Sequence, residues 1–122
     1  MDTTSIYIEN LVGGGGAASL VETTAVLAAN SIGPTLVTGF PGTGAYTVYI
    51  SAANRQSVVA QATKATAAAA GTVSVISHTK AVGITETVNV VWQAGAALSI
   101  THNPIGAVAT PVTYNVGYIG VD

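Results

Sequence analysis

The sequence contains very few charged residues. Only 7% of its 122 residues are Asp, Glu, Lys or Arg, whereas ordinary soluble domains contain about 25%. A monomer with such a surface would have little electrostatic repulsion to keep its copies apart. The net charge of −2 also excludes the basic surface needed to neutralise a phosphate backbone. The composition therefore predicts a packed protein assembly and no nucleic-acid partner.

Several other features are missing. There is no cysteine, which excludes disulfides and thiolate metal sites. Met1 is followed by Asp2 rather than by a basic segment and an apolar stretch, so we expect no secretory signal. The Ala-rich stretch 58–76 is interrupted by Gln61, Lys64 and several threonines, so we expect no membrane span and no membrane partner.

The length and the uninterrupted composition predict one domain. The one candidate boundary within this domain is the only run of four glycines, Gly13, Gly14, Gly15 and Gly16. A phosphate-binding loop would need a following lysine and hydroxyl, but Ala17-Ala18-Ser19 follows. We therefore interpret the run as a flexible hinge between an N-terminal arm or strand, residues 1–12, and a body, residues 17–122.

Apolar residues alternate with polar ones over most of the body, which is typical of strands with one buried face. The clearest alternation occurs in Ala45–Ser51, in a hairpin from Ile84 to His102 with Gly95 at its tip, and in a final strand from Val112 to Tyr118. Pro104 and Pro111 bracket the connection before that final strand, so we expect the strand to lie far from the hairpin.

Further strands are predicted in Ser5–Val12, within Leu20–Ala29, and in Thr35–Phe40, Gln56–Thr63 and Thr72–Thr79. About eight short strands predict an all-β fold, an antiparallel β-sandwich or jelly-roll-like barrel. A helix over Ala17–Ala29 is the alternative for that segment, because Ser19 and Glu22 match a capping box; its β-branched residues favour a strand. Ala65–Ala70 is interpreted as a turn of small residues.

The sequence offers no arrangement of residues that is typical of an enzyme. His78 and His102 are the only histidines, and a metal site would require them to converge with Glu86 or Asp122. There is no G-x-S-x-G motif for a nucleophile and no obvious pair of carboxylates for glycoside cleavage. We predict no catalytic residue, no metal and no cofactor.

Aromatic residues could line a sugar-binding surface, but most alternate with Val and Ile, which favours core or subunit-interface packing. Trp92 is expected to be buried near one end of the sandwich, with its indole N–H donating to a loop carbonyl. The residues predicted to lie in the core or in an interface are Tyr46, Val48, Ile50, Val88, Val90, Trp92, Leu98, Ile100, Tyr114, Val116 and Tyr118.

Two patterns, G-x-Y-x-V-x-I in Gly44–Ile50 and W-x-x-G-x-x-L-x-I in Trp92–Ile100, give the chain a family resemblance. Over roughly residues 35–120 it resembles the small all-β virion proteins of tailed bacteriophages, which include capsid decoration or cement proteins and fibre-knob domains. The resemblance implies a virion location on the capsid surface and, for some members, a trimeric jelly roll. It transfers no functional residue.

Composition and resemblance together predict a viral structural protein. The favoured role is a capsid decoration or cement subunit, a homotrimer that binds the major capsid protein or another virion protein on the outside of a phage head and stabilises it. One alternative is a tail-fibre or head-fibre tip that binds a host glycan. A second is a soluble carbohydrate-binding module.

Overall fold

The computed structural model describes residues 20–120 and shows an all-β chain. Its eight strands are β1 (Val21–Leu27), β2 (Thr35–Leu36), β3 (Gly44–Ala52), β4 (Gln56–Lys64), β5 (Thr72–Lys80), β6 (Thr87–Trp92), β7 (Leu98–Asn103) and β8 (Val112–Gly120).

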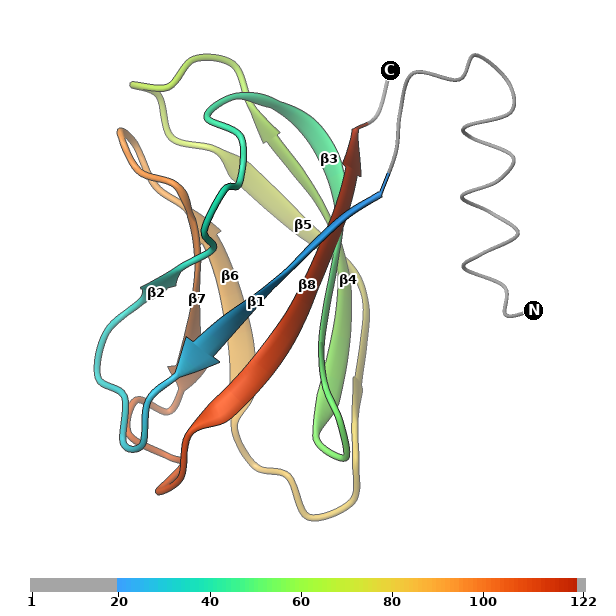
Figure 1. The fold of residues 1–122 in the computed structure, drawn as a ribbon, viewed down its shortest axis with the longest axis vertical. Helices are drawn as coiled ribbons and strands as arrows, with labels where there is room; N and C mark the ends of the chain where they lie inside the picture. The colour runs from blue at the N-terminus through green and yellow to red at the C-terminus, as the bar shows by residue number, and fades with distance from the viewer. Residues whose placement is uncertain (1–19, 121–122) are drawn as a thin grey trace, which may run out of the picture.

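The strands form two antiparallel sheets that face each other (Figure 1). The larger sheet has the order β1-β8-β3-β4-β5, and the smaller has the order β2-β7-β6. The nested pairs β1–β8 and β2–β7 are of the jelly-roll kind, whereas β3, β4 and β5 follow one another as a meander. The predicted all-β sandwich is thus confirmed.

The strongest alternation patterns predicted their strands well. The β6–β7 hairpin pairs Trp92 with Leu98, and Gly95 lies in its turn with a φ of 68°. The final strand, β8, lies in the other sheet, between β1 and β3, as the two prolines before it indicated. Ala65–Ala70 forms the turn that was expected between β4 and β5.

Two details differ from the sequence prediction. The helical alternative for Ala17–Ala29 is wrong where the structure describes it, because Val21–Leu27 pairs with β8 along its whole length. The strand predicted for Thr35–Phe40 ends at Leu36, because the chain turns at Gly39 (φ 78°) and the Phe40 amide donates to the Val37 carbonyl. The predicted arm, its strand Ser5–Val12 and the glycine hinge lie outside the described residues.

The hydrophobic core lies between the two sheets. Of the residues predicted for the core or an interface, Tyr46 and Val90 are partly buried and pack against the core cluster. The others are buried within it: Val48, Ile50, Val88, Trp92, Leu98, Ile100, Tyr114, Val116 and Tyr118.

Aromatic rings fill one end of this core. The Phe40 ring lies against Trp92 and Tyr118, with centroid distances of 5.1 Å and 4.5 Å, and Tyr46 borders the same cluster. Trp92 is only 2% exposed. Its expected hydrogen bond to a loop carbonyl is not formed, and Nε1 is buried without a partner.

The buried Lys64 closes the aromatic end of the core. Its Nζ donates to the carbonyls of Gln93, at 2.6 Å, and Ala96, at 3.0 Å, in the β6–β7 turn. The same ammonium lies 5.5 Å from the centre of the Trp92 ring, within the range of a cation–π interaction. A side chain of the larger sheet therefore holds the hairpin of the smaller one.

Candidate functional site

Two places in the described chain gather polar side chains from several strands. One is a buried network between the sheets, at the end opposite the aromatic cluster, which centres on Gln56. The other is an open groove on the outer face of the larger sheet. The first joins elements inside the protein, and only the second is accessible to a ligand.

Gln56 is the first residue of β4 and is buried. Its Oε1 accepts from the Val88 amide, at 3.0 Å, and lies 2.9 Å from Nε2 of His78. Its Nε2 donates to the Tyr114 hydroxyl, at 3.1 Å, and more weakly to the Glu86 carbonyl, at 3.4 Å. One amide from the larger sheet thus binds the open edge of β6 in the smaller sheet.

The Val88 amide can only donate, so it fixes the orientation of the Gln56 amide and the direction of the bonds beyond it. Since Nε2 of Gln56 donates to the Tyr114 oxygen, the Tyr114 hydroxyl is free to donate to Nε2 of His102, 2.7 Å away. Burial raises the pKa of Tyr114 to about 12, which keeps this hydroxyl protonated. The network therefore holds His102 in its neutral form.

An ion pair closes the network toward solvent. The half-buried Arg55 donates from Nε and Nη2 to one carboxylate oxygen of the buried Glu86, at 2.8 Å and 2.5 Å. Burial by itself would raise the pKa of Glu86, but a hydrogen bond from its own amide and the Arg55 guanidinium together lower it. Glu86 is therefore a carboxylate, and its charge is neutralised within the protein.

The unfolding free energy is expected to fall on mild acidification because of His102. Burial lowers the pKa of His102 below its usual value, although the Glu86 carboxylate opposes this shift. Below a pH of about 6.5 the unfolded chain takes up a proton that the folded chain excludes, so stability is lost as the pH falls. Uptake of one such proton lowers the unfolding free energy by at most about 1.4 kcal/mol for each pH unit.

The lowered pKa of Glu86 adds a second loss of unfolding free energy below a pH of about 4.5.

Urea denaturation between pH 8 and pH 5 measures this loss. His102→Gln keeps an acceptor for Tyr114 and should flatten the profile above pH 5. If the unfolding free energy of the His102→Gln variant fell with pH as steeply as that of the unmodified protein, His102 could not be the cause of the loss.

The two histidines do approach the same network, as a metal site would require, but in a different role. His78 contacts Gln56 and His102 contacts Tyr114, so both Nε2 atoms are engaged in hydrogen bonds. Among residues 20–120 there is no group of three or more His, Cys, Asp or Glu side chains that could hold a metal ion. Asp122, the other acid considered as a ligand, lies outside the described residues.

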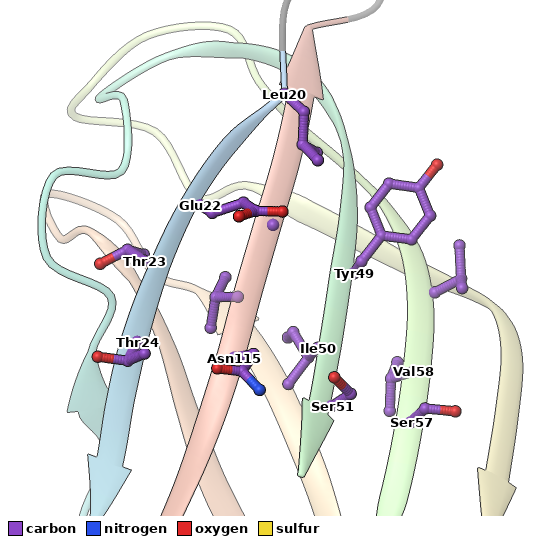
Figure 2. Close-up of a pocket in the computed structure, with 13 residues that line it drawn as sticks. Leu20, Glu22, Thr23, Thr24, Tyr49, Ile50, Ser51, Ser57, Val58 and Asn115 are labelled. Carbon is purple, nitrogen blue, oxygen red and sulfur yellow. The ribbon is translucent and has the colours of Figure 1, made fainter. Parts of the chain in front are cut away.

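The groove crosses β1, β8, β3 and β4 on the outer face of the larger sheet and has a volume of about 690 Å³. Two rows of paired residues form its floor. One row contains Glu22, Gly117, Tyr49 and Val59; the other contains Thr24, Asn115, Ser51 and Ser57. Figure 2 shows the Glu22, Asn115 and Tyr49 side chains on three neighbouring strands.

Gly117 gives the groove its depth. A Cβ at this position would lie 3.4 Å from Leu20 Cδ1 and 4.0 Å from Tyr49 Cβ, so any side chain there would fill the space between Glu22 and the Tyr49 ring. The floor of the groove thus combines a carboxylate, an amide, three serine or threonine hydroxyls and an aromatic ring. Such groups can hydrogen-bond a polyhydroxylated ligand and stack on its apolar face.

Most of the few charged side chains of the described body are buried or paired. Residues 20–120 contain Glu22, Arg55, Lys64, Lys80 and Glu86. Lys64 and Glu86 are buried, and the half-buried Arg55 is paired with Glu86. Among the described residues, only Glu22 and Lys80 are exposed charged side chains.

Sequence reasoning missed Gln56 and Lys64, although a signal for both exists. Gln56, Val58, Ala60, Ala62 and Lys64 share the inward face of β4 and are all buried. An alternating apolar row with a polar residue at each end therefore marks both buried contacts. The groove residues carry no comparable pattern, because they come together only through the pairing of β1, β8, β3 and β4.

Comparison of the chain with protein-family models, curated proteins and solved structures found no match. Residues 20–120 include no helix that is long and apolar enough to cross a membrane.

Proposed function

We propose that the chain is a structural subunit of a virion, and within that class a capsid decoration or cement protein that binds the outside of a phage head. The observation that carries the proposal is the nearly uncharged surface of the described sandwich, where Glu22 and Lys80 are the exposed charged side chains. Such a surface can pack against neighbouring proteins on several sides without desolvating ions.

Exposed apolar side chains support the same proposal. They occur in both sheets and in the connections, and include Val26, Ile32, Leu36, Val75, Ile76, Val82 and Ile105. Single exposed apolar residues are ordinary on a soluble protein. Combined with so little charge, they favour self-association, which we propose to be trimeric, and contact with the major capsid protein or another virion protein.

A second candidate function rests on the groove. Its carboxylate, amide, hydroxyls and aromatic ring suit a glycan, as a fibre tip or a carbohydrate-binding module would require. Glu22→Gln together with Asn115→Ala would remove the carboxylate charge and the asparagine amide of the groove without touching the core, because both side chains are exposed.

Two measurements test the proposed function. Sedimentation of the recombinant chain at micromolar concentration should show an oligomer, and a particle that carries the protein should hold hundreds of copies on its head. A few copies at the tail would indicate the fibre tip instead. A stable monomer that binds glycans, and loses this binding in the Glu22→Gln/Asn115→Ala variant, would overturn the structural role in favour of the carbohydrate-binding module.

A further inference from the structure

The groove on the outer face of the larger sheet continues beyond β4. A second hollow, of about 430 Å³, lies beside it and shares Ser51, Ser57 and Asn115 with it. These three residues are register partners across β8, β3 and β4, and Figure 2 shows their side chains in one row. The two hollows are therefore parts of one depression, which we call the outer trough.

The outer trough crosses the whole of the larger sheet. It begins at Glu22 on β1 and ends at Lys80, the last residue of β5. The sheet has five strands, and four spacings of about 4.8 Å give a span of about 19 Å. The turn between β3 and β4, Ala53–Arg55, borders the end at Lys80. An open depression of this length suits a chain of linked units better than a single compact molecule.

The floor of the outer trough offers hydrogen-bonding groups without charge. Asn115 contributes an amide, and Ser51 and Ser57 contribute hydroxyls, so each of these side chains can both donate and accept. Beside them, the Tyr49 ring borders the space that Gly117 leaves open. Neutral polar groups around an aromatic ring suit a ligand with many hydroxyls and an apolar face, which is the chemistry of an oligosaccharide.

A peptide or a nucleic acid fits this floor less well. The strands β8, β3 and β4 are internal to the larger sheet, so their main-chain groups are paired and cannot bind an added peptide strand. Lys80 is the only exposed lysine or arginine side chain among residues 20–120, whereas a phosphate backbone requires several cations.

The two exposed charged side chains of the described body lie at opposite ends of the outer trough, Glu22 at one and Lys80 at the other. The Lys80 ammonium forms no hydrogen bond or ion pair with residues 20–120, whereas Arg55 at the same end is paired with Glu86. Glu22 lies about 19 Å away across the strands, more than twice the screening length of about 8 Å at physiological salt. An anionic group near Lys80 is therefore attracted by Lys80 and almost unaffected by Glu22.

We propose that the outer trough binds a linear oligosaccharide that carries a carboxylate, as a uronic acid does. One sugar ring stacks on Tyr49 above Gly117, hydroxyls of the neighbouring units hydrogen-bond Asn115, and the carboxylate pairs with Lys80. This inference deepens the second candidate function, glycan binding in the groove, and rests on it. Its tests use the isolated chain, so their outcome is independent of assembly into a virion.

NMR titration of the isolated chain measures the preference for a charged ligand. The probes are tetrasaccharides of galacturonic acid, of mannuronic acid and of hyaluronan, each compared with its methyl ester, which has the same chain without the charge. At least one acid should bind about two- to fivefold more tightly than its ester, the usual effect of one exposed ion pair. The preference should disappear in about 1 M salt. Equal binding of every acid and its ester would overturn this inference alone, whereas no binding of any probe would also count against the second candidate function.

Lys80→Gln assigns the preference to one end of the outer trough. This variant should bind an acid and its ester equally, while the ester binds as it does to the unmodified chain. Glu22→Gln is the matched control, because it removes the exposed charge at the other end; it should weaken both forms by the same factor and so preserve their ratio. A preference that persisted in Lys80→Gln, or vanished in Glu22→Gln, would contradict the proposed orientation.

Gly117→Val tests the floor of the outer trough. The added side chain would occupy the space between Glu22 and the Tyr49 ring, so binding of acid and ester should both weaken at least about tenfold. Valine favours strands, and circular dichroism shows whether the fold is retained. Asn115→Ala, at an exposed position, should also weaken both forms. Asn89→Ala, an exposed asparagine of β6 in the other sheet, is the control and should bind normally. Normal binding by folded Gly117→Val, or by Asn115→Ala, would overturn the assigned site.

Discussion

Trp92→Ala is expected to lower the unfolding free energy by about 3–5 kcal/mol, the usual loss when a buried tryptophan is truncated. Trp92 is 2% exposed and lies against the Phe40 ring at 5.1 Å. The substitution would leave a cavity at the aromatic end of the core and would remove the ring beneath the Lys64 ammonium. Urea denaturation followed by circular dichroism measures the loss.

Val91→Ala is the matched control for this loss. Val91 is the preceding residue of β6 and points to the opposite face, where it is 37% exposed. We expect its truncation to cost under about 1 kcal/mol. If Trp92→Ala cost no more than this control, the ring could not be part of the core.

Trp92→Phe tests how much of this loss comes from the aromatic ring and how much from the indole N–H. The indole Nε1 is buried without a partner, and a buried unsatisfied donor costs about 1–3 kcal/mol. Removal of this group offsets part of the volume lost, so Trp92→Phe should be much less destabilising than Trp92→Ala. Equal losses in the two variants would contradict the observed burial of Nε1.

Gln56→Leu should lower the unfolding free energy by about 2–4 kcal/mol, even though leucine is similar in size and apolar. The substitution leaves the Val88 amide without its acceptor and the Tyr114 hydroxyl without a donor inside the protein. Each buried polar group that loses its partner costs about 1–3 kcal/mol. Chemical denaturation at pH 8, where His102 is neutral in both states, isolates this effect.

Gln61→Leu is the control for Gln56, because the two glutamines lie on opposite faces of β4. Gln61 is half-buried and forms one side-chain hydrogen bond, to the Thr47 hydroxyl at 2.9 Å, so its replacement should cost less than that of Gln56, which loses several. Gln56→Leu and Tyr114→Phe should also be non-additive, since they remove parts of one network. Equal effects of the two glutamine variants, or additivity with Tyr114→Phe, would show that Gln56 does not link the sheets.

Local patterns predicted most of the strands because each depends on neighbouring residues. In β8 the residues Val112, Tyr114, Val116 and Tyr118 recur with the period of a strand and are all buried. The segment Thr35–Phe40 has strand-forming residues as well, but a turn at Gly39 sends Phe40 into the aromatic cluster. That contact joins residues far apart in the chain and has no local signature.

The two candidate sites depend even more on distant contacts. Gln56 binds Val88 and Tyr114, which lie 32 and 58 residues further along the chain. The groove is formed by β1, β8, β3 and β4, whose order in the sheet differs from their order in the sequence. No periodicity in a single segment can indicate such groupings, because the period identifies the face of a strand and not its neighbour.

Composition and a period of two are enough to predict the all-β class, most of the strands, their inward faces and the scarcity of charge. The positions of the few charges, in contrast, depend on the folding of the chain. The fold buries Lys64 against the β6–β7 turn and pairs Glu86 with Arg55, which leaves Glu22 and Lys80 as the exposed charged side chains of the described body. It also placed β5 at an open edge, because burial depends on which sheet covers a strand and not on the residues of that strand alone.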